Sequence, residues 1–101
     1  MRFFFAKPRI QRLYETLDGA EGYPRGVVDS FFKVMSVIRA DSSSLDFYSL
    51  KSLHFKELKG QRLKPPLKSM RLNRQYHLEL RIYENAEGKH AEIITISKHY
   101  E

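Results

Sequence analysis

The side chains best suited to chemistry in this sequence are arginines and histidines in its second half. His77 and Arg81 lie in the run 76–83, where apolar and polar residues alternate as in a strand with one buried face. Arg71 and His99 fall on the matching phase of the neighbouring strands, so the four side chains could converge on one open face. A guanidinium binds phosphate with two hydrogen bonds, and imidazole changes charge near neutral pH. These residue types indicate phosphate binding and proton transfer on an exposed sheet.

Positive charge is concentrated in the same part of the chain. Between Lys51 and Arg81, nine Lys or Arg stand against two acidic residues, a balance of +7, whereas the whole chain carries +6. The remaining residues therefore sum to −1, and the positive field is local. Clustered Lys and Arg favour a polyanionic partner, because they neutralise phosphates and release counterions.

Two amphipathic helices are predicted in the first half, after a short strand over 2–7. Pro8 suits the first turn of a helix, and apolar residues then recur at helical spacing as far as Leu17. A second stripe at helical spacing predicts a helix whose Phe and Met form core rather than cofactor contacts. Its residues are Val27, Val28, Phe31, Phe32, Met35 and Ile38.

The second half is predicted to be a meander of strands. After a short turn or helix before Leu50, Leu53 and Phe55 are expected to face inward and His54 and Lys56 outward. Gly60 allows a turn and Pro65-Pro66 a loop over 61–67. Two strands over 68–73 and 75–84 are expected next, or one bent strand with an irregularity near Arg74, followed by a hairpin loop over 85–89 and a strand over 90–97. Burial is expected at Met70, Leu72, Tyr76, Leu78, Leu80, Ile94 and Ile96, with Ser69, Thr95 and Ser97 outward.

Composition narrows the class of protein. The chain has 101 residues, 42% of them hydrophobic, enough for one domain with a core. No run is long enough for a membrane span and none suits a signal peptide, so a cytoplasmic protein is expected. There is no cysteine and the four histidines are scattered, so neither a metal site nor a cofactor is expected.

Long stretches of the second half resemble a known family. The runs YSLKSLHFKELKG and SMRLNRQYHLELRIYENAEGKHAEIITISKHYE closely resemble HigB-like toxins, also called plasmid-maintenance killer proteins, of the RelE/ParE superfamily. The resemblance implies a single α+β domain over residues 1–101 with the RelE-like fold. In that fold a short N-terminal strand precedes two helices, which pack on a curved antiparallel sheet of about four or five strands.

The resemblance also implies an activity and its partners. It implies a type II toxin–antitoxin toxin, a metal-independent, ribosome-dependent endoribonuclease that cuts messenger RNA and inhibits translation. Its partners would be messenger RNA in the ribosomal A site, ribosomal RNA and a helix-turn-helix, HigA-like antitoxin. DNA would be contacted only through the antitoxin complex, and no membrane is involved.

Catalytic residues are carried over one by one from the motifs. Lys59 in LKG matches the family's catalytic-face lysine, and Lys56 falls where some members carry histidine. Arg71 matches the arginine of the family's SIRIN motif, and His99 matches the C-terminal histidine. His77 departs from the pattern, since it replaces an arginine. A second departure is Ser97, where several members have an acid, and the loop after Gly60 is longer.

These residues suggest a cleavage mechanism. A base would deprotonate the 2′-hydroxyl, positive charge would stabilise the phosphorane, and an acid would protonate the departing 5′-oxygen. His99 is the preferred acid, Lys56 or His77 the base, and Arg71 and Lys59 the phosphate ligands. Six further residues are expected to contact RNA: Arg62, Lys64, Lys68, Arg74, Arg81 and Tyr100.

Two other functions remain open at this stage. The superfamily includes ParE-like toxins that poison gyrase without cutting RNA. Alternatively, the substitutions at His77 and Ser97 suit a catalytically degenerate module that binds only RNA or its antitoxin. His54 and His90 are expected to be structural or simply exposed.

Overall fold

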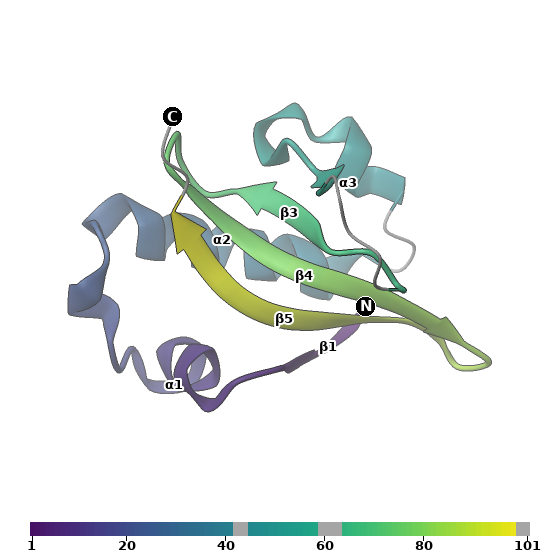
Figure 1. The fold of residues 1–101 in the computed structure, drawn as a ribbon, viewed down its shortest axis with the longest axis horizontal. Helices are drawn as coiled ribbons and strands as arrows, with labels where there is room; N and C mark the ends of the chain where they lie inside the picture. Colours follow the sequence, from purple (N-terminus) through teal and green to yellow (C-terminus); the bar gives the residue numbers. More distant parts are fainter. Residues whose placement is uncertain (42–44, 59–63, 99–101) are drawn as a thin grey trace.

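Five strands form one mixed sheet in the computed structural model, which describes residues 1–41, 45–58 and 64–98 (Figure 1). Across the sheet the order is β1 (Arg2–Phe5), β5 (Gly88–Lys98), β4 (Tyr76–Asn85), β3 (Lys68–Arg71) and β2 (Lys56–Glu57). β1 is an edge strand that runs parallel to β5, and all other neighbours are antiparallel. The predicted α+β class is confirmed, with a mixed sheet in place of a purely antiparallel one.

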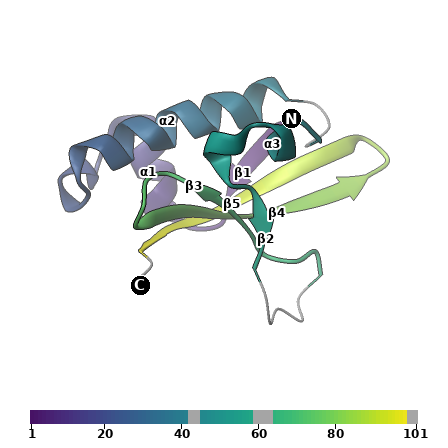
Figure 2. The same cartoon turned by 90° about the horizontal axis from the view of Figure 1, so that it is seen from above.

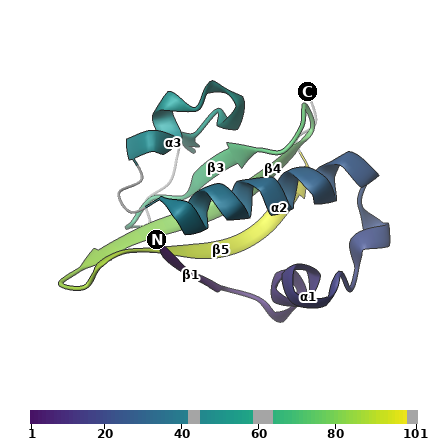
Figure 3. The ribbon, with the colours of Figure 1, turned by 180° about the vertical axis from the view of Figure 1, so that it is seen from behind.

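Three helices lie on one side of this sheet and leave the other side open. They are α1 (Pro8–Thr16), α2 (Arg25–Ala40) and α3 (Leu45–Ser49), joined by the 3₁₀ turns η1 (Ala20–Gly22) and η2 (Lys51–Leu53). Figure 2 shows α2 and α3 above the sheet, and Figure 3 shows α2 crossing β3, β4 and β5. The uncovered side is therefore the surface on which the predicted site residues must be sought.

The helices bury the apolar stripes that predicted them. In α2, Val27, Phe31, Met35 and Ile38 are fully buried. The Tyr14 ring of α1 packs edge-on to Phe31, with ring centroids 6.2 Å apart, and this contact joins the two helices. Aromatic pairs of this kind add roughly 0.5–1.5 kcal/mol beyond the area they bury.

The first helix ends earlier than its apolar pattern suggests. Leu17 adopts the left-handed conformation, with φ 64°, and its N–H closes the last turn on the Leu13 carbonyl. Its side chain is 54% exposed, so Leu17 does not join Ile10 and Leu13 in the core although it continues their helical spacing. A residue in the left-handed region ends a helix and turns its side chain away from the packed face.

The segment before β2 is not the strand that its alternation predicts. Leu53 ends the 3₁₀ turn η2, and His54 has φ 45°, which breaks the extended backbone. Only Lys56 and Glu57 pair in β2. Leu53 and Phe55 are nevertheless buried and His54 exposed, because packing against the helices sets burial here without a regular strand.

A bulge changes the predicted phase of β5. Glu79 pairs with Thr95 but Leu80 pairs with Ile93, so Ile94 is the extra residue between them. Ile93 and Ile96 are buried and Ile94 is only half-buried, which corrects the expectation for Ile94. Ser69 lies in the outward phase of β3 as predicted, but its neighbours bury it completely.

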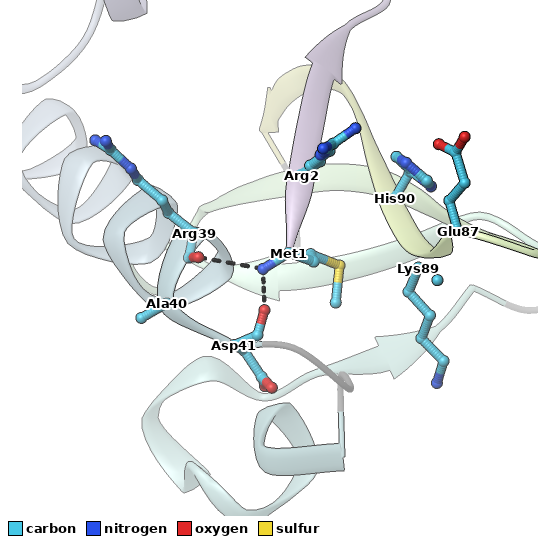
Figure 4. A pocket seen from close by; sticks show the side chains of 9 residues that line it. Met1, Arg2, Arg39, Ala40, Asp41, Glu87, Lys89 and His90 are labelled. Carbon is cyan, nitrogen blue, oxygen red and sulfur yellow. Dashed lines mark hydrogen bonds between the residues drawn. The ribbon is translucent and has the colours of Figure 1, made fainter.

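The N-terminal ammonium of Met1 caps the C-terminal end of α2. It donates to the carbonyls of Ile38, at 2.9 Å, Arg39, at 3.2 Å, and Asp41. Figure 4 shows the last two contacts beside Arg2 and His90. The last carbonyls of a helix lack partners within it and carry partial negative charge, so a cation is favourable there. The contact fixes β1 against α2.

Gly88 is the position where the hairpin requires glycine. It has φ 110° and closes a two-residue loop after Asn85, with which it pairs. We expect Gly88→Ala to lower the free energy of unfolding by about 1–3 kcal/mol, because L side chains rarely adopt this conformation. Urea unfolding measures the loss. Gly26→Ala is the matched control: φ is not positive there, and an added Cβ meets nothing within 4 Å, so stability should be unchanged or slightly higher.

Candidate functional site

The candidate site is the side of the sheet opposite the helices, which we call the open face. Its members alternate along each strand with the buried residues Met70, Leu78, Leu80 and Ile93. Pairing between strands aligns them in rows across the sheet. The open face consists of Arg2, Phe4, Lys56, Ser69, Arg71, His77, Glu79, Arg81, Tyr83, His90, Glu92, Thr95 and Ser97.

One row brings together the residues best suited to phosphate binding and proton transfer. Arg71 lies opposite His77 in the β3–β4 pairing, and His77 lies opposite Ser97 in the β4–β5 pairing. On the outer side, Arg71 Nη1 is 3.0 Å from Nε2 of His54. The sequence predicts that Arg71, His77, Arg81 and His99 converge. The pairing brings Arg71 and His77 together, Arg81 lies in another row beside Glu92, and His99 lies outside the described residues. We call His54, Arg71, His77 and Ser97 the histidine–arginine row.

The contact between Arg71 and His54 joins a donor to an imidazole nitrogen. A guanidinium only donates hydrogen bonds, so Nε2 of His54 is the acceptor in this contact. Arg71 Nε donates in addition to the Asn73 carbonyl, at 3.3 Å. Two acceptors thus orient the half-buried guanidinium and leave its remaining N–H groups for a ligand.

The importance of His54 was missed by the sequence analysis, which treated it as structural or exposed. Its left-handed backbone is uncommon for a residue with a side chain, and such conformations cluster at functional sites. The only sequence signal was the outward phase that His54 shares with Lys56. Its contact with Arg71 depends on how β2 pairs with β3, which the sequence does not show.

A second row carries mixed charge. Lys56 lies opposite Ser69, which is followed across the sheet by Glu79 and Thr95. The described open face has more cationic than acidic side chains, namely Arg2, Lys56, Arg71 and Arg81 against Glu79 and Glu92. The face is therefore net positive within the described residues, but it is not uniformly basic.

A third group surrounds the carboxylate of Glu92. Tyr83 donates its hydroxyl to Glu92 Oε1, at 3.0 Å, and Arg81 Nη1 lies 3.6 Å from the same oxygen. Part of the positive charge expected from Arg81 is therefore neutralised within the protein. The same contacts hold the Tyr83 ring in one orientation.

The remaining predicted RNA contacts lie elsewhere. Lys68 extends to the helix side, where Nζ donates to the Tyr48 hydroxyl, at 2.9 Å, and lies 5.3 Å from the Phe55 ring centre. Lys64 is exposed before β3, and Arg74 is exposed in the bend before β4. Four predicted site residues, Lys59, Arg62, His99 and Tyr100, lie outside the described residues, as do Gly60 and part of the predicted loop.

Comparison with known proteins identifies the fold. No family model matches the chain, and no curated protein does so. Among solved structures, a YoeB/ParE toxin from Agrobacterium tumefaciens superposes with a TM-score of 0.57 over 99% of this chain and 100% of that one, at 14% identity. The chain has the fold of that toxin. At this identity the likeness shows the fold alone, so activity has to be argued from the residues on the open face.

The described part of the chain contains neither a group of metal ligands nor a membrane-spanning helix. Within residues 1–41, 45–58 and 64–98, no three His, Asp or Glu side chains are grouped as metal ligands. In the same ranges, no helix is long and apolar enough to cross a membrane.

The pKa of Tyr83 gives a test of the Glu92 contacts. Burial of part of the ring raises this pKa, the hydrogen bond and charge of Glu92 raise it further, and Arg81 lowers it. Because the pKa of Tyr83 is raised in the folded protein, the neutral phenol contributes its full stabilisation below pH about 10, the ordinary pKa of tyrosine. This contribution is lost as pH rises through the pKa of the folded state. Phenylalanine does not ionise, so we expect Tyr83→Phe to lose less stability than wild type as pH rises above about 10. Urea unfolding on both sides of this pH measures the difference. An identical pH dependence in both proteins would contradict the assignment.

Proposed function

We propose that this protein is a HigB-like toxin of a type II toxin–antitoxin system, of the RelE/ParE superfamily, that cleaves messenger RNA on the ribosome. The observation that carries the proposal is the histidine–arginine row, in which an oriented guanidinium lies between two imidazoles on a net positive, open sheet face. The toxin fold and the motif resemblance of the second half are consistent with it.

Arg71 is the proposed phosphate ligand. Its guanidinium is permanently charged, and the contacts with His54 and Asn73 fix its direction before RNA binds. A donor fixed in this way loses little conformational freedom when charge develops on the phosphate in the transition state. Lys56, in the next row, and Lys59 in the LKG motif would add positive charge.

Proton transfer is assigned to histidines. His77, opposite Arg71, is favoured as the base over Lys56, because His77 lies in the same row as the phosphate ligand. It would take the proton of the 2′-hydroxyl as that oxygen attacks phosphorus. His99 would donate a proton to the 5′-oxygen as its bond to phosphorus breaks, leaving a 2′,3′-cyclic phosphate and a 5′-hydroxyl end. No metal ion is required in this scheme, because protein groups supply both the protons and the charge.

The partners follow from the proposed class. The toxin would act on messenger RNA in the ribosomal A site, contact ribosomal RNA with its basic segment, and be neutralised by a helix-turn-helix, HigA-like antitoxin. DNA would be bound only by the complex with that antitoxin, and the toxin would work in the cytoplasm.

The proposal is tested by induced expression in bacteria, with wild type beside His99→Ala and primer extension on a translated messenger. We expect wild type to arrest growth and to produce new 5′ ends in register with codons, and the variant to lose both. Circular dichroism of the purified variant verifies that it is folded.

Two other outcomes would replace the proposal. Growth arrest without new RNA ends would favour a gyrase poison of the ParE-like kind. The matched structure is named a YoeB/ParE toxin, so this alternative is kept. No arrest, with retained binding to ribosomes or to the antitoxin, would favour a degenerate binding module.

A further inference from the structure

An exposed aromatic pair lies on the open face, away from the histidine–arginine row. Phe4 of β1 is 48% exposed and Tyr83 of β4 is 36% exposed. Their ring centroids are 6.3 Å apart, and the ring planes are inclined by 37°. Among the described residues of the open face, these two are the aromatic side chains, and neither belongs to the hydrophobic core.

Both rings are held in place by the sheet. Phe4 is opposite Glu92 in the parallel β1–β5 pairing, and Tyr83 donates its hydroxyl to the carboxylate of the same Glu92. The aromatic pair is therefore oriented in advance. A rigid aromatic surface loses little side-chain entropy when a planar group stacks on it.

The groups around the aromatic pair favour a nucleic acid over an apolar protein segment. Arg2 and His90 are paired neighbours beside it, and both line a cavity of about 540 Å³ that also contains Arg39 and Lys89 (Figure 4). Three permanent cations, Arg2, Arg39 and Lys89, line this cavity against Asp41 and Glu87, and of the three Arg2 shares the open face with the rings. Proteins that bind single-stranded nucleic acids combine stacking rings with a basic groove.

The aromatic pair also lies along a continuous path from the histidine–arginine row. His77 and Tyr83 lie on the same face of β4, six residues apart, which corresponds to about 20 Å of strand. A single strand that crosses the row could follow β4 over several nucleotides to reach the rings.

We infer that Phe4 and Tyr83 form a base-stacking subsite for single-stranded RNA, separate from the cleavage centre, with Arg2 and its cationic neighbours binding the adjoining phosphates. The inference rests on the proposed function in one respect, namely that RNA is the polyanion bound by the open face. The subsite would give affinity rather than catalysis, because it lies far from the reacting phosphate.

The test is binding of a short fluorescent RNA in which 2′-O-methyl groups prevent cleavage, followed by anisotropy. We expect Phe4→Ala and Tyr83→Ala each to weaken binding by about fivefold to a hundredfold, the range that loss of one stacked base gives. Phe4→Leu should also weaken binding, since it keeps apolar surface but not the ring. Tyr83→Phe keeps the ring but loses the hydrogen bond to Glu92 that orients it, so its affinity should lie between that of wild type and that of Tyr83→Ala.

Tyr48→Ala is the matched aromatic control. Tyr48 is 57% exposed but belongs to α3 on the helix side, so its removal should leave RNA affinity unchanged. Equal loss of affinity in Tyr48→Ala, or full affinity in the double variant Phe4→Ala with Tyr83→Ala, would overturn the subsite. So would full RNA affinity in the double variant combined with lost binding to the antitoxin, which would make the aromatic pair a protein interface.

Failure of the subsite is distinguishable from failure of the proposed function. Wild type that binds the modified RNA through these rings but produces no cuts in translated messengers keeps the subsite and refutes the nuclease. Wild type that cuts messengers but shows no affinity for the oligonucleotide refutes the subsite and keeps the nuclease.

Discussion

Replacing Arg71 by alanine should reduce RNA cleavage by about 100-fold to 1,000-fold, the loss seen when one positioned donor to a developing anion is removed. The guanidinium is oriented by His54 and Asn73 and lies opposite His77, so the substitution removes the oriented donor of the histidine–arginine row. Arg71→Lys should recover only part of the activity, since an ammonium keeps the charge but loses the planar fork. Cleavage is measured on programmed ribosomes as initial rates.

The control for this prediction is Arg9→Ala. Arg9 is an exposed residue of α1, on the helix side of the sheet, and its removal changes the net charge of the protein equally. We expect its activity to stay within about twofold of wild type, because single surface charges act weakly at this distance. Activity of Arg71→Ala as high as that of Arg9→Ala would refute the role of Arg71 as phosphate ligand.

Phe31→Ala should lower the free energy of unfolding by about 3–5 kcal/mol, the usual effect of removing a fully buried aromatic side chain. Phe31 is completely buried on α2 and its ring contacts Tyr14 and Phe32. The substitution therefore leaves a cavity at the junction of α1, α2 and the sheet. Urea unfolding measures the change, and the melting temperature should fall by more than about 12 °C.

Phe4→Ala serves as the control for the core prediction. It removes the same side chain from a position that is 48% exposed, so a loss of about 1 kcal/mol or less is expected. A loss in Phe31→Ala as small as that expected for Phe4→Ala would mean that the packing of Phe31 in the helix layer contributes little to stability. A small loss in Phe4→Ala would also confirm that this variant is folded in the RNA-binding experiment.

Local patterns predicted most of the elements because local physics determines them. The stripe from Val27 to Ile38 gives α2, since only a helix places those residues on one side. Pro8 begins α1, because its ring fixes φ near the helical value and the first turn does not need its missing N–H. Gly88 allows the hairpin, because few other residues accept a positive φ. Alternation along β4 also assigned His77, Glu79 and Arg81 to one face before any pairing was known.

The failures have equally specific causes. Ile94 was assigned to the core because a bulge is an interaction between two strands and leaves no signal within one of them. Leu17 continues the apolar spacing of α1 but lies at its end, where the left-handed backbone turns the side chain outward. Leu53 is buried as predicted, but it ends a 3₁₀ turn where a strand was predicted. The direction of β1, parallel to β5, likewise depends on strands at opposite ends of the chain.

The candidate site also combines features that the sequence determined with features that only the tertiary structure decided. The sequence by itself determined the residue types, the local positive charge and the open-face phase of Arg71, His77 and Ser97, because each of these depends only on neighbours in the chain. Tertiary structure alone decided that His54 orients Arg71, that Lys68 turns to the helix side, and that Phe4 joins Tyr83 around Glu92. These contacts join residues 9 to 79 positions apart in the sequence. The register of the paired strands and the packing of α3 and its following turn against the sheet bring such residues together.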